Sequence, residues 1–220
     1  MFLAFMVVSD NSNPIIMISS PFFILHLQNP LLDKEIQFYL DNFSNFGFKL
    51  HTFVSNFPLS KVKRFFRGID VPLLIHSGAD SHSAPSEIIK FAKGYKGNIL
   101  MAHAARLSSK HLKEISRVPN LFVDVSPLTS FYKRILEKDY STILESSKNF
   151  DEMLLPQDIY KYILKFCDPK KVLFGTDAPW CNHFGLGYER EVESLRSLDV
   201  SKEVKDCISH KNFITFLKRK

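Results

Sequence analysis

Short apolar segments alternate with amphipathic segments along most of the chain. The apolar segments, among them VPLLIH and NILMAH, show no polar alternation, which is typical of strands buried on both faces. The pattern predicts strands within residues 1–8, 15–27, 48–54, 71–77, 98–103, 121–126 and 172–177. Apolar residues at helical spacing and helix-boundary residues predict helices over 31–46, 58–68, 85–95, 108–116, 156–167, 188–198, 201–208 and 211–217.

Strands that alternate with helices indicate βαβ units around a parallel sheet. No interdomain linker or internal repeat interrupts the pattern, so we expect residues 1–220 to form one α/β domain. Residues 131–151 are polar and poorly periodic, and we expect a long loop there, with partial helix or a lid as alternatives.

Charge and cysteine content narrow the classes of partner. The formal net charge is +6, but Lys and Arg are spread along the chain with short clusters only at Lys61–Arg67 and Lys218–Lys220, so we expect no nucleic-acid partner. The apolar start MFLAFMVV is too short to span a bilayer and lacks the basic residues of a signal peptide, so we expect no membrane partner. Three widely spaced cysteines favour a reducing, cytoplasmic setting over a disulfide framework.

Three of the apolar segments end on a residue that can bind a metal ion: His76, His103 and Asp177. Because the carboxyl ends of parallel strands lie at one edge of the sheet, these side chains are expected to meet where α/β proteins bind ligands. Neutral imidazole is a common zinc ligand, and a carboxylate at the end of a buried strand needs a cation or several hydrogen bonds. His76 and Asp177 are therefore candidate metal ligands, with a capped core histidine and a turn aspartate as the alternatives.

The roles of His103 and Asp177 extend beyond ligation. His103 can bind the metal or act as an acid or electrostatic stabiliser beside the metal-bound water, and we favour the second role. Asp177 can also accept a proton from that water. We therefore expect both residues to be catalytic.

Other residues near the ends of these segments are candidates for supporting roles. Lys49 and His51 share one face of their strand and can reach substrate, with a carboxylate of the barrel interior as the alternative partner of Lys49. Arg106 can hold a substrate carboxylate or form a surface salt bridge. Asp124 and Ser126 close the segment LFVDVS, where hydrogen bonds to the neighbouring metal ligands are expected.

Five motifs in chain order resemble the amidohydrolase superfamily, in particular its amidohydrolase-related branch. That branch includes enzymes like aminocarboxymuconate-semialdehyde decarboxylase and pyrone dicarboxylate lactonase. The resemblance implies an α/β fold of the (β/α)8 barrel type and a divalent metal, usually zinc, held by His76 and Asp177 with His103 beside it. It also implies hydrolysis or non-oxidative decarboxylation of a small organic acid, ester, lactone or amide. The motifs are Gly47–His51, Pro72–Gly78, Ile99–Arg106, Asn120–Ser126 and Val172–Trp180.

The chain departs from this family at its start. Family members begin with a strand that carries an His-X-His pair of metal ligands, and these 220 residues contain no such pair. The motif order therefore predicts an incomplete barrel in which the first strand or two are missing, and two ligands bind zinc poorly. The chain is expected to be a metal-dependent hydrolase or decarboxylase. The alternative is a catalytically inactive shortened homologue, or a fragment, that serves in binding or assembly. A metal-dependent nuclease barrel fits the motifs less well, and a homodimer is left open.

Overall fold

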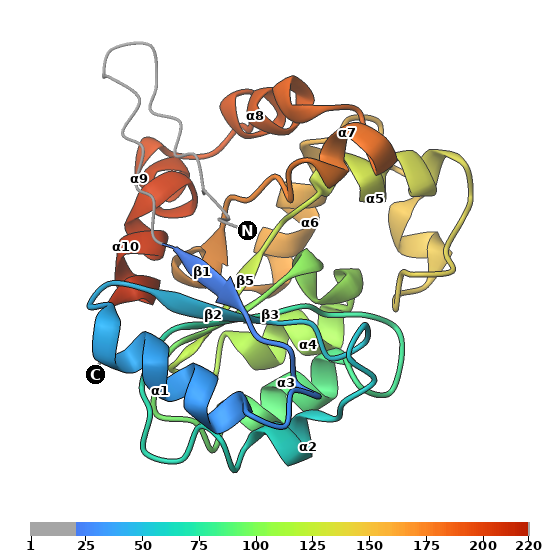
Figure 1. The fold of residues 1–220 in the computed structure, drawn as a ribbon. Coiled ribbons are helices and arrows are strands. Elements are labelled where there is room, and N and C mark those ends of the chain that lie inside the picture. The colour runs from blue at the N-terminus through green and yellow to red at the C-terminus, as the bar shows by residue number, and fades with distance from the viewer. Residues whose placement is uncertain (1–20, 220) are drawn as a thin grey trace.

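The computed structural model describes residues 21–219, which form a six-stranded parallel sheet surrounded by helices (Figure 1). The strands lie side by side in chain order, from β1 to β6. Every neighbouring pair is parallel, as expected for strands joined by helical crossovers. Their bounds are β1 Phe22–Ile24, β2 Gly47–Leu50, β3 Leu73–Ile75, β4 Ile99–Met101, β5 Leu121–Asp124 and β6 Val172–Leu173.

Ten α-helices lie within the described residues. Helices α1 to α4 lie together on one side of the first strands, whereas α5, α7 and α8 lie beyond the other side of the sheet (Figure 1). The helices are α1 Leu32–Asn42, α2 Leu59–Val62, α3 Pro85–Ala92, α4 Ser109–Ile115, α5 Leu128–Leu136, α6 Asp158–Phe166, α7 Trp180–Phe184, α8 Tyr188–Arg196, α9 Lys202–Asp206 and α10 Asn212–Leu217. None of the described helices is long and apolar enough to cross a membrane.

Alternate side chains of the strands face two separate apolar cores, because successive residues of a strand point to opposite faces. The larger core lies between the sheet and its surrounding helices. The smaller core lies on the opposite face of the sheet, where α10 covers the strands. It comprises Phe22, Leu74, Leu100, Ala102, Phe122, Leu173, Phe213 and Phe216. Burial on both faces explains why the strands read as unbroken apolar segments.

The expected α/β fold with an incomplete barrel is confirmed for the part of the chain that the structure describes. Six parallel strands in chain order, each followed by helical structure, reproduce the order expected for a (β/α)8 barrel without its first strands. The predicted strand at residues 1–8 and the first part of the stretch at 15–27 lie outside the described residues.

Residues 131–151 combine loop with helix, which agrees with the partial-helix alternative: α5 extends from Leu128 to Leu136, and a 3₁₀ turn follows a loop at Ser147–Phe150. Two local predictions are wrong. The strands are two to four residues long, so His51, His76, His103, Ser126 and Asp177 lie in the turns that follow them. The predicted helices 201–208 and 211–217 are joined into one run by a π turn.

The first backbone N–H groups of helix α5 donate hydrogen bonds to a carboxylate that is distant in sequence. Glu191 of α8 is almost fully buried, and its Oε2 accepts a hydrogen bond from the backbone N–H of Leu128 at 3.0 Å. Its Oε1 accepts from the backbone N–H and the hydroxyl of Thr129, at 3.0 and 2.6 Å. A carboxylate at this position satisfies N–H groups that have no partner within the helix. The start of α5 is therefore fixed by a residue more than 60 positions away.

We predict that Glu191→Ala destabilises the protein by about 2–4 kcal/mol, because three buried donors lose their acceptor. The measurement is the free energy of unfolding in urea. The control is Glu193→Ala on the exposed side of the same helix, which is expected to change stability by less than about 0.5 kcal/mol. Equal effects of the two substitutions would show that Glu191 does not hold α5.

Candidate active site

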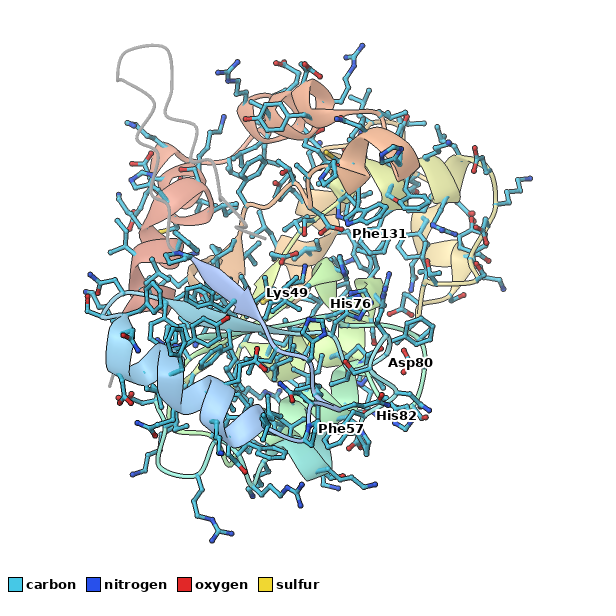
Figure 2. The ribbon with its side chains drawn as sticks, viewed as in Figure 1. Lys49, Phe57, His76, Asp80, His82 and Phe131 are labelled. Carbon is cyan, nitrogen blue, oxygen red and sulfur yellow. The ribbon has the colours of Figure 1, made fainter. Side chains whose placement is uncertain are left out.

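A cavity of about 570 Å³ opens at the carboxyl ends of the strands, a volume typical of small-molecule sites. Lys49 and His76 lie near the centre of the molecule, and Phe131 of α5 lies above them in the view of Figure 2. The cavity is lined by Lys49, His51, Phe53, Val54, His76, His103, Arg106, Pro127, Ser130, Phe131, Arg134, Thr142, Asp177, Trp180 and Phe184. Six residues predicted from the sequence to be site residues are thus brought together: Lys49, His51, His76, His103, Arg106 and Asp177.

Two of the histidines form a hydrogen-bonded chain that begins at a backbone carbonyl. His103 Nδ1 lies 2.7 Å from the carbonyl oxygen of Ser126, and its Nε2 lies 2.8 Å from Nδ1 of His76. A carbonyl oxygen only accepts, so Nδ1 of neutral His103 carries the proton and its Nε2 is the acceptor. His76 must then donate from Nδ1. The lone pair of His76 is therefore on Nε2, the nitrogen that makes no bond in this chain.

The predicted supporting residues Asp124 and Ser126 lie beneath this chain rather than in the cavity lining. Asp124 Oδ1 accepts hydrogen bonds from the backbone N–H of His103 at 3.0 Å and from the backbone N–H and hydroxyl of Ser126 at 2.9 and 2.7 Å. Asp124 thereby fixes the positions of His103 and Ser126, which are hydrogen-bonded to each other. Its burial raises the pKa of the carboxyl, while the hydrogen bonds from Ser126 and His103 act against that shift.

A left-handed turn places His103 and Arg106 at the same cavity. Five consecutive residues, His103 to Leu107, have φ between 49° and 64°, which is costly for residues with a β-carbon. Ala104 and Ala105 in the middle of the turn are fully buried. Such strain persists only where surrounding contacts impose it, and it is concentrated at functional sites.

Cations outnumber carboxylates around the cavity. Arg106 is held by burial and by the nearby Arg134 at a pKa of about 10, so it remains charged at neutral pH. Burial raises the pKa of Asp177 to about 6, and the charge of Lys49 opposes that rise. Nε of Arg106 is buried and has no hydrogen-bond partner within residues 21–219. An anion would compensate these cations.

The donor set falls short of a complete metal site. Within residues 21–219, no group of three or more His, Cys, Asp and Glu side chains is placed to hold a metal ion. Nε2 of His103 is engaged by His76, which leaves Nε2 of His76, the carboxylate of Asp177 and the imidazole of His51 at the cavity. A catalytic zinc usually has three protein ligands and a water. His51 adds a ring stacked on His76, with centroids 4.0 Å apart.

Sequence reasoning missed the residues that α5 and α7 contribute. Phe131 and Arg134 come from α5, in the stretch expected to be a loop, and Trp180 and Phe184 come from α7. Trp180 and Phe184 stack with centroids 5.8 Å apart and are about half exposed, at 47% and 54%. The available sequence signal is their position, because Trp180 and Phe184 follow the predicted site residue Asp177 by three and seven residues.

Because His76 and His103 are buried in the neutral form, we predict that the protein loses stability in acid. Burial lowers the pKa of His103 to about 3 and lowers that of His76 further, whereas an unfolded histidine titrates near 6.5. Below pH 6.5 the unfolded chain binds protons that the folded chain does not, so stability is full above 6.5 and falls as the pH drops toward 3. Each histidine contributes up to about 1.4 kcal/mol per pH unit in metal-free protein.

The measurement is the free energy of unfolding between pH 7 and pH 5, without metal, for the wild type and for the double variant His76→Gln/His103→Gln. The double variant is expected to show a shallower slope whatever its absolute stability. His183→Gln, which replaces an exposed histidine, serves as the control and should keep the wild-type slope. An unchanged slope in the double variant would contradict the assignment of two neutral buried histidines.

Comparison with known proteins gives the family. A family model described as amidohydrolase matches residues 46–219, whereas no curated protein matches the chain. Among solved structures, an amidohydrolase from Burkholderia multivorans with bound HEPES is similar with a TM-score of 0.61 at 12% identity, over 95% of this chain and 76% of that one. A second structure of an amidohydrolase from this organism contains zinc.

Two decarboxylases have similar folds at low identity. The 5-carboxyvanillate decarboxylase of Sphingomonas paucimobilis has a TM-score of 0.57 at 12% identity, over 95% of this chain and 69% of that one. A 2,6-dihydroxybenzoate decarboxylase complexed with 2,6-dihydroxybenzoate has a TM-score of 0.55 at 14% identity, over 90% and 70%. The family model covers most of the chain, and the fold of these enzymes agrees with it. The chain therefore belongs to the amidohydrolase family.

Proposed function

We propose that this chain binds a small organic acid in the cavity, as the substrate of a hydrolysis or a non-oxidative decarboxylation. The observation that carries the proposal is the composition of the cavity. Lys49, Arg106 and Arg134 face it with a single carboxylate, that of Asp177, and aromatic side chains form its outer walls. Guanidinium groups bind carboxylates with two parallel hydrogen bonds, and a largely apolar wall with few polar groups is typical of small-molecule sites.

Each group has a defined task in this proposal. Arg106, with an unpartnered buried Nε, binds the carboxylate of the acid, and Lys49 contributes a second positive charge. Trp180 and Phe184 pack against the carbon skeleton. His76 presents the lone pair of Nε2 and accepts a hydrogen bond from a hydroxyl or water of the bound molecule.

A divalent metal, zinc in the family expectation, would supply a nucleophilic water at neutral pH. His76 and Asp177 are the residues that would hold it, and the described residues contain no group of three or more side chains placed to complete a zinc site. Hydrolysis through a metal-bound water therefore requires ligands that residues 21–219 do not provide. The incomplete donor set favours a second candidate function, in which the chain binds the acid without turnover.

We predict that benzoate raises the melting temperature of the protein, whereas benzamide, which has the same ring without the charge, does not. Arg106→Gln is expected to weaken benzoate binding at least about 10-fold, because the charged hydrogen bonds to the carboxylate are lost. Isothermal titration of both proteins with benzoate measures this effect.

The control is Arg117→Gln, which removes an exposed arginine outside the cavity and should leave benzoate binding unchanged. Equal binding of benzoate and benzamide, or an Arg106 variant that binds benzoate like the wild type, would contradict the acid site. Assays of ester and lactone hydrolysis and of decarboxylation, with and without added zinc, separate the two candidates, since only the enzyme produces turnover.

A further inference from the structure

The positive charge of this chain is concentrated on three consecutive helices and the turns that follow them. Residues 59–70, 85–96 and 109–117, here called the basic face, carry ten Lys and Arg against three Asp and Glu, a formal charge of +7. The whole chain has +6, so the remaining residues are close to neutral. The ten cations are Lys61, Lys63, Arg64, Arg67, Lys90, Lys93, Lys96, Lys110, Lys113 and Arg117, and the carboxylates are Asp70, Glu87 and Glu114.

The fold brings these residues together on one side of the molecule. Helix α3 packs against both α2 and α4, and the three helices lie side by side below the sheet in Figure 1. All ten cationic side chains are exposed. They are far apart in sequence, which is why no basic stripe is visible there.

The basic face lies away from the candidate active site. Most of its cations are at the carboxyl ends of the helices or in the turns that lead into β3, β4 and β5. A helix of a βα unit runs antiparallel to its strand, so these turns lie at the amino ends of the strands. The cavity lies at the carboxyl ends, and none of the ten cations lines it. A ligand of the basic face therefore leaves the cavity open.

Two hollows shape the surface of the basic face. One of about 380 Å³ is lined by Lys63, Arg64, Arg67 and Lys96. The other, of about 600 Å³, is lined by Lys93, Lys110, Lys113 and Arg117 together with Glu114. The carboxyl end of α3 separates them. Gly94 lies there and leaves room for the side chain of Lys63, since a β-carbon at position 94 would lie 3.0 Å from Nζ of Lys63.

Most of these cations have no carboxylate partner. Lys93 pairs with Glu114 at 2.7 Å, and among residues 21–219 the structure gives no ion pair to the other nine. Arg64 and Lys113 lie over the rings of Phe65 and Phe166, at 4.5 and 5.1 Å from the ring centroids, which orients them without neutralising them. A formal charge of +7 on one face of the molecule produces a positive potential there.

The basic face has little exposed apolar area, and this narrows the kind of polyanion that fits it. No large hydrophobic side chain of the basic face is more than partly exposed, whereas thirteen such side chains are exposed elsewhere in the described residues. Insertion into an anionic membrane and docking of an acidic protein both use exposed apolar or aromatic anchors, and single strands use aromatic rings for stacking. A duplex phosphate backbone requires only Lys and Arg. We propose that the basic face binds the phosphate backbone of double-stranded nucleic acid without sequence preference.

The test is fluorescence anisotropy of the full chain with a labelled duplex DNA of mixed sequence and about 25 base pairs. For four to five neutralised phosphates the association constant is expected to fall about 10²- to 10³-fold between roughly 50 and 200 mM NaCl. Lys63→Glu/Arg67→Glu should weaken binding at the lower salt concentration at least about 10-fold and reduce the salt slope by about 2. Lys113→Glu/Arg117→Glu tests the second hollow in the same way.

The matched control is Lys148→Glu/Lys170→Glu, which changes the net charge equally at exposed lysines outside the basic face. It should retain most of the affinity, and circular dichroism should show all three double variants folded. The proposal is overturned if the wild type does not bind the duplex at the lower salt concentration, or if the control pair weakens binding as much as the face variants. Tighter binding to a single strand or to phosphatidylserine vesicles than to the duplex would also overturn it.

Discussion

The buried carboxylate of Asp124 is the contact on which the arrangement of the site depends. It stands at the last residue of β5 and accepts three hydrogen bonds, one from the backbone of His103 after β4 and two from Ser126. A charge buried in this way is tolerated only when it is well hydrogen-bonded. By satisfying Asp124, the chain fixes the turns after two neighbouring strands relative to each other. The His103 ring then meets the Ser126 carbonyl, and His76 meets His103.

This hydrogen-bond chain determines which ring nitrogens of His76 and His103 are available to a ligand in the cavity. The two histidines are neutral because they are buried among cations, and the first of them uses both ring nitrogens in hydrogen bonds. What remains for a ligand is Nε2 of His76, the imidazole of His51, the Asp177 carboxylate and three cationic side chains. The proposed function uses this surface to bind an anion rather than a metal cation. The reaction class of the family and the ligand proposed for this cavity are therefore separate questions.

Much of this arrangement could be predicted from the sequence, for a physical reason. Strands buried on both faces leave unbroken apolar segments, and the polar residue after each segment necessarily lies at the carboxyl edge of a parallel sheet. On this basis His76, His103 and Asp177 are expected to lie close together, and the structure places them in one cavity with Lys49, His51 and Arg106. Their catalytic and ligand roles remain predictions.

The features that escaped prediction depend on contacts between distant parts of the chain. Helix α5 begins at a carboxylate supplied by Glu191, which no local pattern reveals. The left-handed turn at Ala104 and Ala105 contradicts the local preference of alanine and is imposed by the surrounding structure. The clustering of lysines and arginines on α2, α3 and α4 exists only once the helices are packed side by side.

The tautomers of His76 and His103 provide the most direct measurement of the central claim, that a hydrogen-bond chain from Ser126 orients the site. Long-range ¹H–¹⁵N spectra of the metal-free protein at neutral pH distinguish the two ring nitrogens of each imidazole. The account predicts that both histidines are neutral and protonated on Nδ1, and that Asp124→Asn disturbs this pattern at both rings. A neutral His76 protonated on Nε2, or a charged ring at either position, would contradict it.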